Sequence, residues 1–153
     1  MNDIVDGGQD KQIDAIKIED SSDEATIYIT QIKSEDNFSS NSIIQIRNGL
    51  KWIFEKRIAD IDQLSNMKFK DRIKDYRKVQ SDLGPSNIYI KVAYIINGGA
   101  SKFSDECQQE IDTIIQTYDN DTFVDFTFEA LGADKLVDIL NSQEKKTKRL
   151  IVS

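Results

Sequence analysis

Residues 13–33 read IDAIKIEDSSDEATIYITQIK, and this stretch decides the fold that we predict for the chain. Apolar and polar residues alternate over 13–19 and again over 25–33, which is the pattern of β-strands. The polar run between them, residues 20–24, is typical of a turn. The stretch therefore predicts an antiparallel β-hairpin.

The isoleucines of these two strands predict how the strands pair. Residues that face each other in an antiparallel hairpin have numbers with a constant sum. A sum of 45 places Asp14 opposite Gln31 and Ile16 opposite Ile29, whereas an even sum places the two isoleucine rows on opposite faces of the sheet. We therefore predict the odd register, in which Asp14, Gln31 and Lys33 share one face with the isoleucines.

Helical spacing and capping residues predict the elements that follow the hairpin. They are a helix from the caps at 39–41 to 61, a helix over 64–83 ended by Gly84-Pro85, a strand over 88–96, a helix from 101 or 104 to 118, a strand over 122–129 and a short helix over 133–141. This order predicts an α/β fold, a mixed β-sheet flanked by α-helices, in a single domain over 1–153. Residues 150–152 look like the start of an unpartnered strand, so we expect the chain to be a fragment of a longer protein.

The composition is that of an ordinary globular domain. Apolar residues make up 39% of the 153 residues and charged residues 31%. The longest apolar run, Val92–Ile96, is far shorter than the roughly 20 residues that cross a bilayer. No targeting signal is visible, so the expected location is the cytoplasm, away from membranes.

The chain has no histidine and one cysteine, Cys107, which we expect to be buried. This composition excludes structural disulfides, ordinary zinc sites and imidazole as a general base. Carboxylates, amides and lysines remain as metal ligands and proton carriers. Such oxygen donors suit Mg²⁺, with Mn²⁺ as an alternative, better than softer metals.

The net charge of −7 argues against a protein that grips nucleic acid with its whole surface. Positive residues nevertheless cluster over 68–78 and over 145–149. The first cluster has a plainer interpretation as a solvated helix face, because Asp71 and Asp75 lie at pairing distance from its bases. Trp52 and the phenylalanines are expected in the core rather than on a base-stacking surface.

Asp14, Gln31 and Lys33 together suggest metal-assisted chemistry on phosphates. A carboxylate and an amide oxygen that lie close together can hold a divalent cation, and a lysine on the same strand face can orient water or neutralise a phosphate. The alternative is that Gln31 and Lys33 merely end an edge strand at the solvent, next to the start of another strand at Asp14.

The longer pattern resembles a known family. Asp-Gly-Gly-x-Asp-x-x-Ile-Asp-Ala-Ile over 6–16, followed by Ile-x-Gln-x-Lys over 29–33, is similar to the nuclease core of the PD-(D/E)xK superfamily. It looks most like the Mrr-type branch, in which Gln replaces the usual Glu, and like the N-terminal domain of bacterial abortive phage infection proteins. The match covers about a fifth of the chain.

The resemblance implies a restriction-endonuclease-like core and an Mg²⁺-dependent endonuclease that hydrolyses DNA in restriction or phage defence in a bacterial cytoplasm. It implies that Asp14, Gln31 and Lys33 are catalytic, and that Asp14, Gln31 and the carbonyl of Ile32 hold the metal. Gly7, Gly8 and Asp10 match the loop that leads into the first active-site strand of the family, which we call the entry loop. The resemblance implies only weakly that they bind substrate.

The resemblance implies DNA as the partner, with RNA as an alternative substrate and a homodimer as one arrangement. Two departures from the family pattern bear on these expectations. The helix that supplies a further glutamate has no counterpart in the five residues before Asp6, where Asp3 or Asp6 could substitute. The acidic balance suggests that target recognition belongs to further domains of a longer parent. The runner-up function is a non-catalytic module with this fold that binds nucleic acid or protein.

Overall fold

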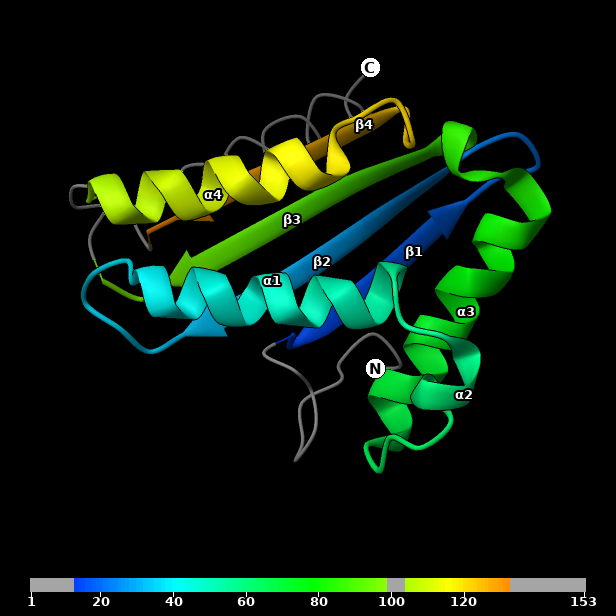
Figure 1. The fold of residues 1–153 in the computed structure, drawn as a ribbon, viewed down its shortest axis with the longest axis horizontal. Coiled ribbons are helices and arrows are strands. Elements are labelled where there is room, and N and C mark those ends of the chain that lie inside the picture. The colour runs from blue at the N-terminus through cyan, green and yellow to red at the C-terminus, as the bar shows by residue number, and fades with distance from the viewer. Residues whose placement is uncertain (1–12, 99–103, 133–153) are drawn as a thin grey trace, which may run out of the picture.

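A computed structural model describes residues 13–98 and 104–132 (Figure 1). Within these residues the strands form one four-stranded sheet in the order β1-β2-β3-β4. The first pair is antiparallel and the other two pairs are parallel, so the sheet is mixed. The strands are β1 (Ala15–Asp20), β2 (Ala25–Lys33), β3 (Ile88–Ile96) and β4 (Asp125–Leu131).

The hairpin forms in the predicted register. Ile16 faces Ile29 and Ile18 faces Ile27, and every pair from Ala15 to Asp20 has the sum 45. Ile16, Ile27 and Ile29 are fully buried, because this register places their side chains on the same covered face. Alternation of apolar residues was therefore sufficient to fix the strand pairing.

Helices cover one face of the sheet. They are α1 (Ser40–Phe54), α2 (Ile58–Ile61), α3 (Met67–Leu83) and α4 (Asp105–Tyr118), with a 3₁₀ turn, η1 (Pro85–Asn87), before β3. Figure 1 shows α1 and α4 lying across the same face, and both run opposite to β2 and β3. The first turns of α1 and α4 therefore lie at the carboxyl ends of these parallel strands.

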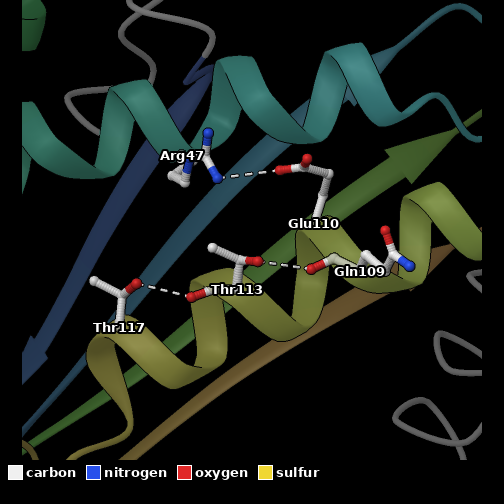
Figure 2. Close-up of polar contacts among 5 residues, drawn as sticks. All are labelled: Arg47, Gln109, Glu110, Thr113 and Thr117. Carbon is white, nitrogen blue, oxygen red and sulfur yellow. Dashed lines mark hydrogen bonds and ion pairs between the residues drawn. The ribbon is translucent and has the colours of Figure 1, made fainter.

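An ion pair joins the two long helices. Arg47 of α1 donates from Nη1 to Oε2 of Glu110 in α4 at 3.1 Å, as Figure 2 shows. Both side chains are about three-quarters buried, so the pair is partly shielded from water. The contact holds α1 against α4 along the middle of the seam between them.

The prediction of one helix from the caps at 39–41 to Ile61 is wrong. The chain leaves α1 after Phe54 and begins the separate turn α2 after Arg57, whose backbone is extended. Arg77 of α3 explains the break, because its guanidinium donates to the carbonyl oxygens of Ile53 at 2.7 Å and Lys56 at 2.7 Å. These bonds satisfy carbonyl groups that a continuing helix would have paired internally.

Other element boundaries differ from prediction by a few residues. Helix α3 begins later than expected, after Asn66, whose side chain accepts a hydrogen bond from the Phe69 amide. The strand predicted over 122–129 begins later, at Asp125, and Val124 just before it is 46% exposed. The predicted helix over 133–141, the strand at 150–152 and the basic run at 145–149 lie outside the described residues.

One hydrophobic core lies between the sheet and the helices. Alternate residues of β2, β3 and β4 contribute to it, and Cys107 of α4 is buried there as expected. Trp52 is half-buried and packs against this core. Gly84 ends α3 with a φ of 81°, a conformation that glycine adopts without strain. Within the described ranges no helix is long and apolar enough to span a bilayer.

Candidate functional site

Asp14 lies beside the end of β2 with its carboxylate bound to the β2 backbone. Its Oδ2 accepts a hydrogen bond of 2.6 Å from the Ile32 amide, and its own amide donates to the carbonyl oxygen of Thr30 at 2.9 Å. Thr30 is also the partner of Ala15 in the β-ladder. Two successive residues, Asp14 and Ala15, thus face one residue, as in a β-bulge, which re-aims side chains at strand ends. The prediction that Asp14 lies directly opposite Gln31 is therefore wrong, because the register of 45 begins only at Ala15.

Gln31 lies on the covered face of β2 and is only 4% exposed. Its Nε2 lies 3.5 Å from the carbonyl oxygen of Ile32. Its Oε1 is buried and has no hydrogen-bond partner among residues 13–98 and 104–132. An unpaired buried amide oxygen is costly, so this atom is the clearest sign of a ligand-binding role in the region.

The Ile32 peptide brings the predicted donors together. The N–H and C=O groups of one strand residue point to the same side of the strand, so the Ile32 carbonyl faces the side on which Asp14 lies. The Asp14 carboxylate contacts the N–H of this residue and the Gln31 amide lies near its carbonyl. The structure therefore brings the Asp14 carboxylate and the Gln31 amide nitrogen to the two backbone polar groups of Ile32.

Lys33 is the last residue of β2 and is half-buried. It lies two positions after Gln31, so the alternation of the strand places both side chains on the same face. Its neighbour across the ladder is Ile96 of β3, which is fully buried. The stem of the lysine thus adjoins the core, while its position at the strand end leads toward solvent.

Backbone contacts join the loops that follow β2 and β3. The Gly98 amide donates to the carbonyl oxygen of Glu35 at 3.1 Å, and Asn97 Nδ2 donates to Ser34 Oγ at 3.4 Å. A Cβ atom at Gly98 would lie 2.3 Å from the carbonyl oxygen of Asp36. The glycine is therefore required by close backbone approach.

Sequence reasoning missed a polar group beneath the first turn of α1. The fully buried hydroxyl of Tyr94, whose Cα pairs with Gln31, accepts a hydrogen bond of 3.2 Å from the Ser39 amide. Ser42 Oγ donates to Glu35 Oε1 at 2.8 Å. The signal for this group in the sequence is that alternate positions 31, 33 and 35 are all polar, which continues one face of β2 into the loop.

The environment of Tyr94 keeps its hydroxyl protonated at neutral pH. Burial is the main cause that raises the pKa of Tyr94, and the charge of Glu35 adds to it. Hydrogen bonds with Ser42 and Ser39 act in the opposite direction without reversing the shift. Tyr94 is therefore a neutral hydrogen-bonding group here.

The basic residues over 68–78 are largely engaged within the protein. Arg72 pairs with Asp75, and Lys74 pairs with Asp62. Lys70 donates to the Asp62 carbonyl oxygen at 3.1 Å, and Arg77 binds the end of α1. These contacts favour the interpretation of an ion-paired helix face over a nucleic-acid surface.

The donors at the end of β2 could hold a hard divalent cation. Mg²⁺ binds one or two carboxylates and completes its shell with other oxygens and water. Here the oxygens are the Asp14 carboxylate, the unpaired Gln31 Oε1 and the Ile32 carbonyl. In the described part of the chain no three Asp, Glu, His or Cys side chains group as metal ligands. The donor set therefore fits a weakly held Mg²⁺ and does not fit zinc.

Several predicted site residues fall outside the described ranges. They are Gly7, Gly8 and Asp10 of the entry loop, together with Asp3 and Asp6. Comparison with known proteins adds nothing to the motif, because no family model, no curated protein and no solved structure matches the chain. The resemblance to PD-(D/E)xK nucleases therefore stays a prediction carried by residues 6–33.

Proposed function

We propose that the chain is a metal-dependent endonuclease domain that hydrolyses DNA phosphodiester bonds. The observation that supports this proposal best is the buried Oε1 of Gln31, which lacks a hydrogen-bond partner among the described residues. Asp14, Gln31 and the Ile32 carbonyl would hold Mg²⁺. When bound, the metal would neutralise charge that develops on the phosphate and lower the pKa of water.

Each protein group has a separate task in this proposal. Asp14 is oriented by its bond to the Ile32 amide, which fixes Oδ2 of its carboxylate. Lys33 supplies a positive charge that stabilises the pentacovalent phosphate or orients the attacking water. With no histidine in the chain, proton transfer falls to water and to these side chains.

The orientation of the helices favours an anionic substrate at this end of the sheet. Helix α1 begins beside β2, and its first turn contains no acidic residue. Backbone N–H groups at a helix N-terminus carry a partial positive charge that attracts phosphate. Capping by Ser39, which accepts from the Ser42 amide at 3.4 Å, uses one of these groups.

A plasmid-nicking assay tests the proposal. Supercoiled plasmid is incubated with wild type, Asp14→Ala and Lys33→Ala, with Mg²⁺, with Mn²⁺ and with EDTA. We expect metal-dependent nicking that each substitution lowers by about a hundredfold or more. A parallel assay on a labelled RNA of the same sequence decides which nucleic acid is preferred.

The matched control is Lys17→Ala. Lys17 is an exposed lysine of β1 whose Nζ lies 3.2 Å from Oε1 of Glu19, so its removal changes the net charge equally without touching the donors. We expect it to nick like wild type. Nicking that survives Lys33→Ala, or that proceeds equally in EDTA, contradicts the proposal.

The runner-up is a non-catalytic binding module, and one observation favours it. The Asp14 carboxylate already accepts a short bond from the Ile32 amide, which is a purely structural role at a strand end. A module of this kind keeps its affinity for nucleic acid or protein after Asp14→Ala and Lys33→Ala. Fluorescence anisotropy with labelled duplex DNA separates the two, because retained binding without nicking in the wild type supports the module.

A further inference from the structure

A pocket lies at the opposite end of the sheet from Asp14. It has a volume of about 170 Å³ and forms where the last turns of α1 and α4 meet α3 and the loop before β4. Drug-sized ligands occupy sites of roughly 300 Å³ or more, so this pocket suits a smaller group. The proposed nuclease chemistry makes no use of it.

Aromatic rings form most of the wall of this pocket. Phe54 is central, with its ring centroid 5.4 Å from that of Tyr76, 5.1 Å from that of Tyr118 and 5.3 Å from that of Phe123. Phe54 and Phe123 are only half-buried. The rings meet at tilted or edge-on angles, which lets more than one π-face line a small cavity.

The Arg47–Glu110 ion pair, drawn in Figure 2, joins the two helices that carry two of these rings, Phe54 and Tyr118. Phe54 follows Arg47 by seven residues and Tyr118 follows Glu110 by eight, so each ring lies on the same helix face as its ion-pair residue. The pair therefore fixes the seam between the helices two turns before the pocket. Phe54 and Tyr118 are in contact as a result.

The polar part of the pocket is negative. Glu55 lines it, and no lysine or arginine occurs among the described residues of its wall. Helix α4 ends there without a basic residue in its last turn, so its C-terminal partial negative charge is not offset by its own side chains. At the end of α1, Arg77 offsets the corresponding charge by binding the Ile53 and Lys56 carbonyl oxygens.

Tyr118 holds the acid beside the rings. Its hydroxyl donates to Glu55 Oε2 at 2.5 Å. Burial, followed by this hydrogen bond, raises the pKa of Tyr118, so the hydroxyl stays a donor at neutral pH. A carboxylate fixed next to aromatic faces is the arrangement that attracts cations with apolar surfaces.

We propose that this pocket binds an alkylated ammonium group, as found in small quaternary amines and in methylated lysine side chains. The aromatic faces of Phe54 and Phe123 contact its methyl groups, and Glu55 and the end of α4 balance its charge. A plain ammonium or a metal ion is a poorer fit, since both are strongly hydrated and gain little from rings.

A titration with choline tests this proposal. Binding is followed by isothermal calorimetry on the full chain, with 3,3-dimethylbutan-1-ol as the uncharged isostere. We expect choline to bind about tenfold more tightly than the isostere, because the cation–π contribution requires the charge. A peptide with one trimethyllysine is titrated in parallel, and whichever of the two binds more tightly identifies the source of the group.

Two variants and a matched control connect this binding to the pocket. Phe123→Leu and Glu55→Gln should each weaken choline binding by about fivefold. Glu106→Gln removes the same charge at the other end of α4, in its exposed first turn, and should stay within about twofold of wild type. Circular dichroism confirms that each variant is folded.

Three results would overturn the proposal. They are the absence of saturable choline binding, equal binding of choline and its isostere, and equal effects of Glu55→Gln and Glu106→Gln. Plasmid nicking is unaffected by any of these results, so a failure here is distinguishable from a failure of the proposed nuclease function.

Discussion

The two ends of the sheet differ in the side chains that they carry. At the carboxyl ends of β2 and β3, where α1 and α4 begin, lie Asp14, Gln31 and Lys33. At the other end, where the same helices stop, lie aromatic rings and Glu55. Both helices run in the same direction, so their dipoles place partial positive charge at the first end, where Asp105 and Glu106 of α4 oppose it, and partial negative charge at the second end. Under the two proposals above, the first end would bind phosphate and the second a cation.

Gly98→Ala should cause the largest loss of stability, and the substitution lies at the end of the sheet that contains Asp14. The new Cβ would lie 2.3 Å from the Asp36 carbonyl oxygen, so the backbone must move, at a cost of about 3 kcal/mol in the free energy of unfolding. Urea denaturation measures the loss, with the exposed Ser86→Ala as control. If the ends are independent, nicking falls while choline binding by the folded fraction is unchanged.

The next effect should come from Arg77→Ala at the aromatic end. The substitution removes hydrogen bonds to the carbonyl oxygens of Ile53, Lys56 and Trp52, and it should lower the free energy of unfolding by about 2 kcal/mol. The neighbouring exposed Lys78→Ala should change it by less than about 0.5 kcal/mol. Equal losses in the two variants would mean that Arg77 does not hold the end of α1.

Each end also contains a buried polar atom that lacks a partner within the described residues, Oε1 of Gln31 and the hydroxyl of Tyr76. Gln31→Met and Tyr76→Phe should each raise the free energy of unfolding by about 1 kcal/mol, since an unsatisfied group is removed. Only Gln31→Met should abolish nicking. If Gln31→Met is more stable than wild type and still nicks DNA, the Gln31 amide does not belong to the proposed site.

The smallest effect concerns alkaline pH. Burial raises the pKa of Tyr76 and Tyr118 above the ordinary value of 10.0, so the folded chain keeps these protons while the unfolded chain loses them. Stability is therefore intact below pH 10 and declines above it, by somewhat less than about 1 kcal/mol per tyrosine between pH 9 and 10.5. Chemical denaturation at these two pH values should show a smaller decline in Tyr118→Phe. An identical decline would mean that Tyr118 titrates normally.

The sequence predicted the elements that depend on local periodicity. The hairpin register followed from alternating isoleucines, because a one-residue slip would expose the whole row. The strand predicted from the apolar run over 88–96 is β3, and Ser104, one of the two positions predicted to begin the next helix, is the N-cap of α4. In these cases the determining contacts lie within a few residues or a single hairpin.

The features that the sequence did not predict depend on residues far apart in the chain. The end of α1 is fixed by Arg77, more than twenty positions later, and nothing in the local pattern marks it. The aromatic pocket combines the ends of three helices, so Phe54 and Phe123 looked like ordinary core residues. The bulge at Asp14 was not predicted for the same reason, since it is visible only when β2 lies beside Asp14.

The contact of Gly98 with the segment after β2 has a consequence for local motion. Its amide donates to the Glu35 carbonyl oxygen, and a Cβ atom on its α-carbon would have no room beside Asp36. The residues just after β2 and just after β3 therefore open together rather than separately. Hydrogen exchange at the Gly98 amide should then be as slow as in the interior of β3. Glu35, Asp36 and Gly98 then form a rigid frame beside Lys33 rather than a flexible rim.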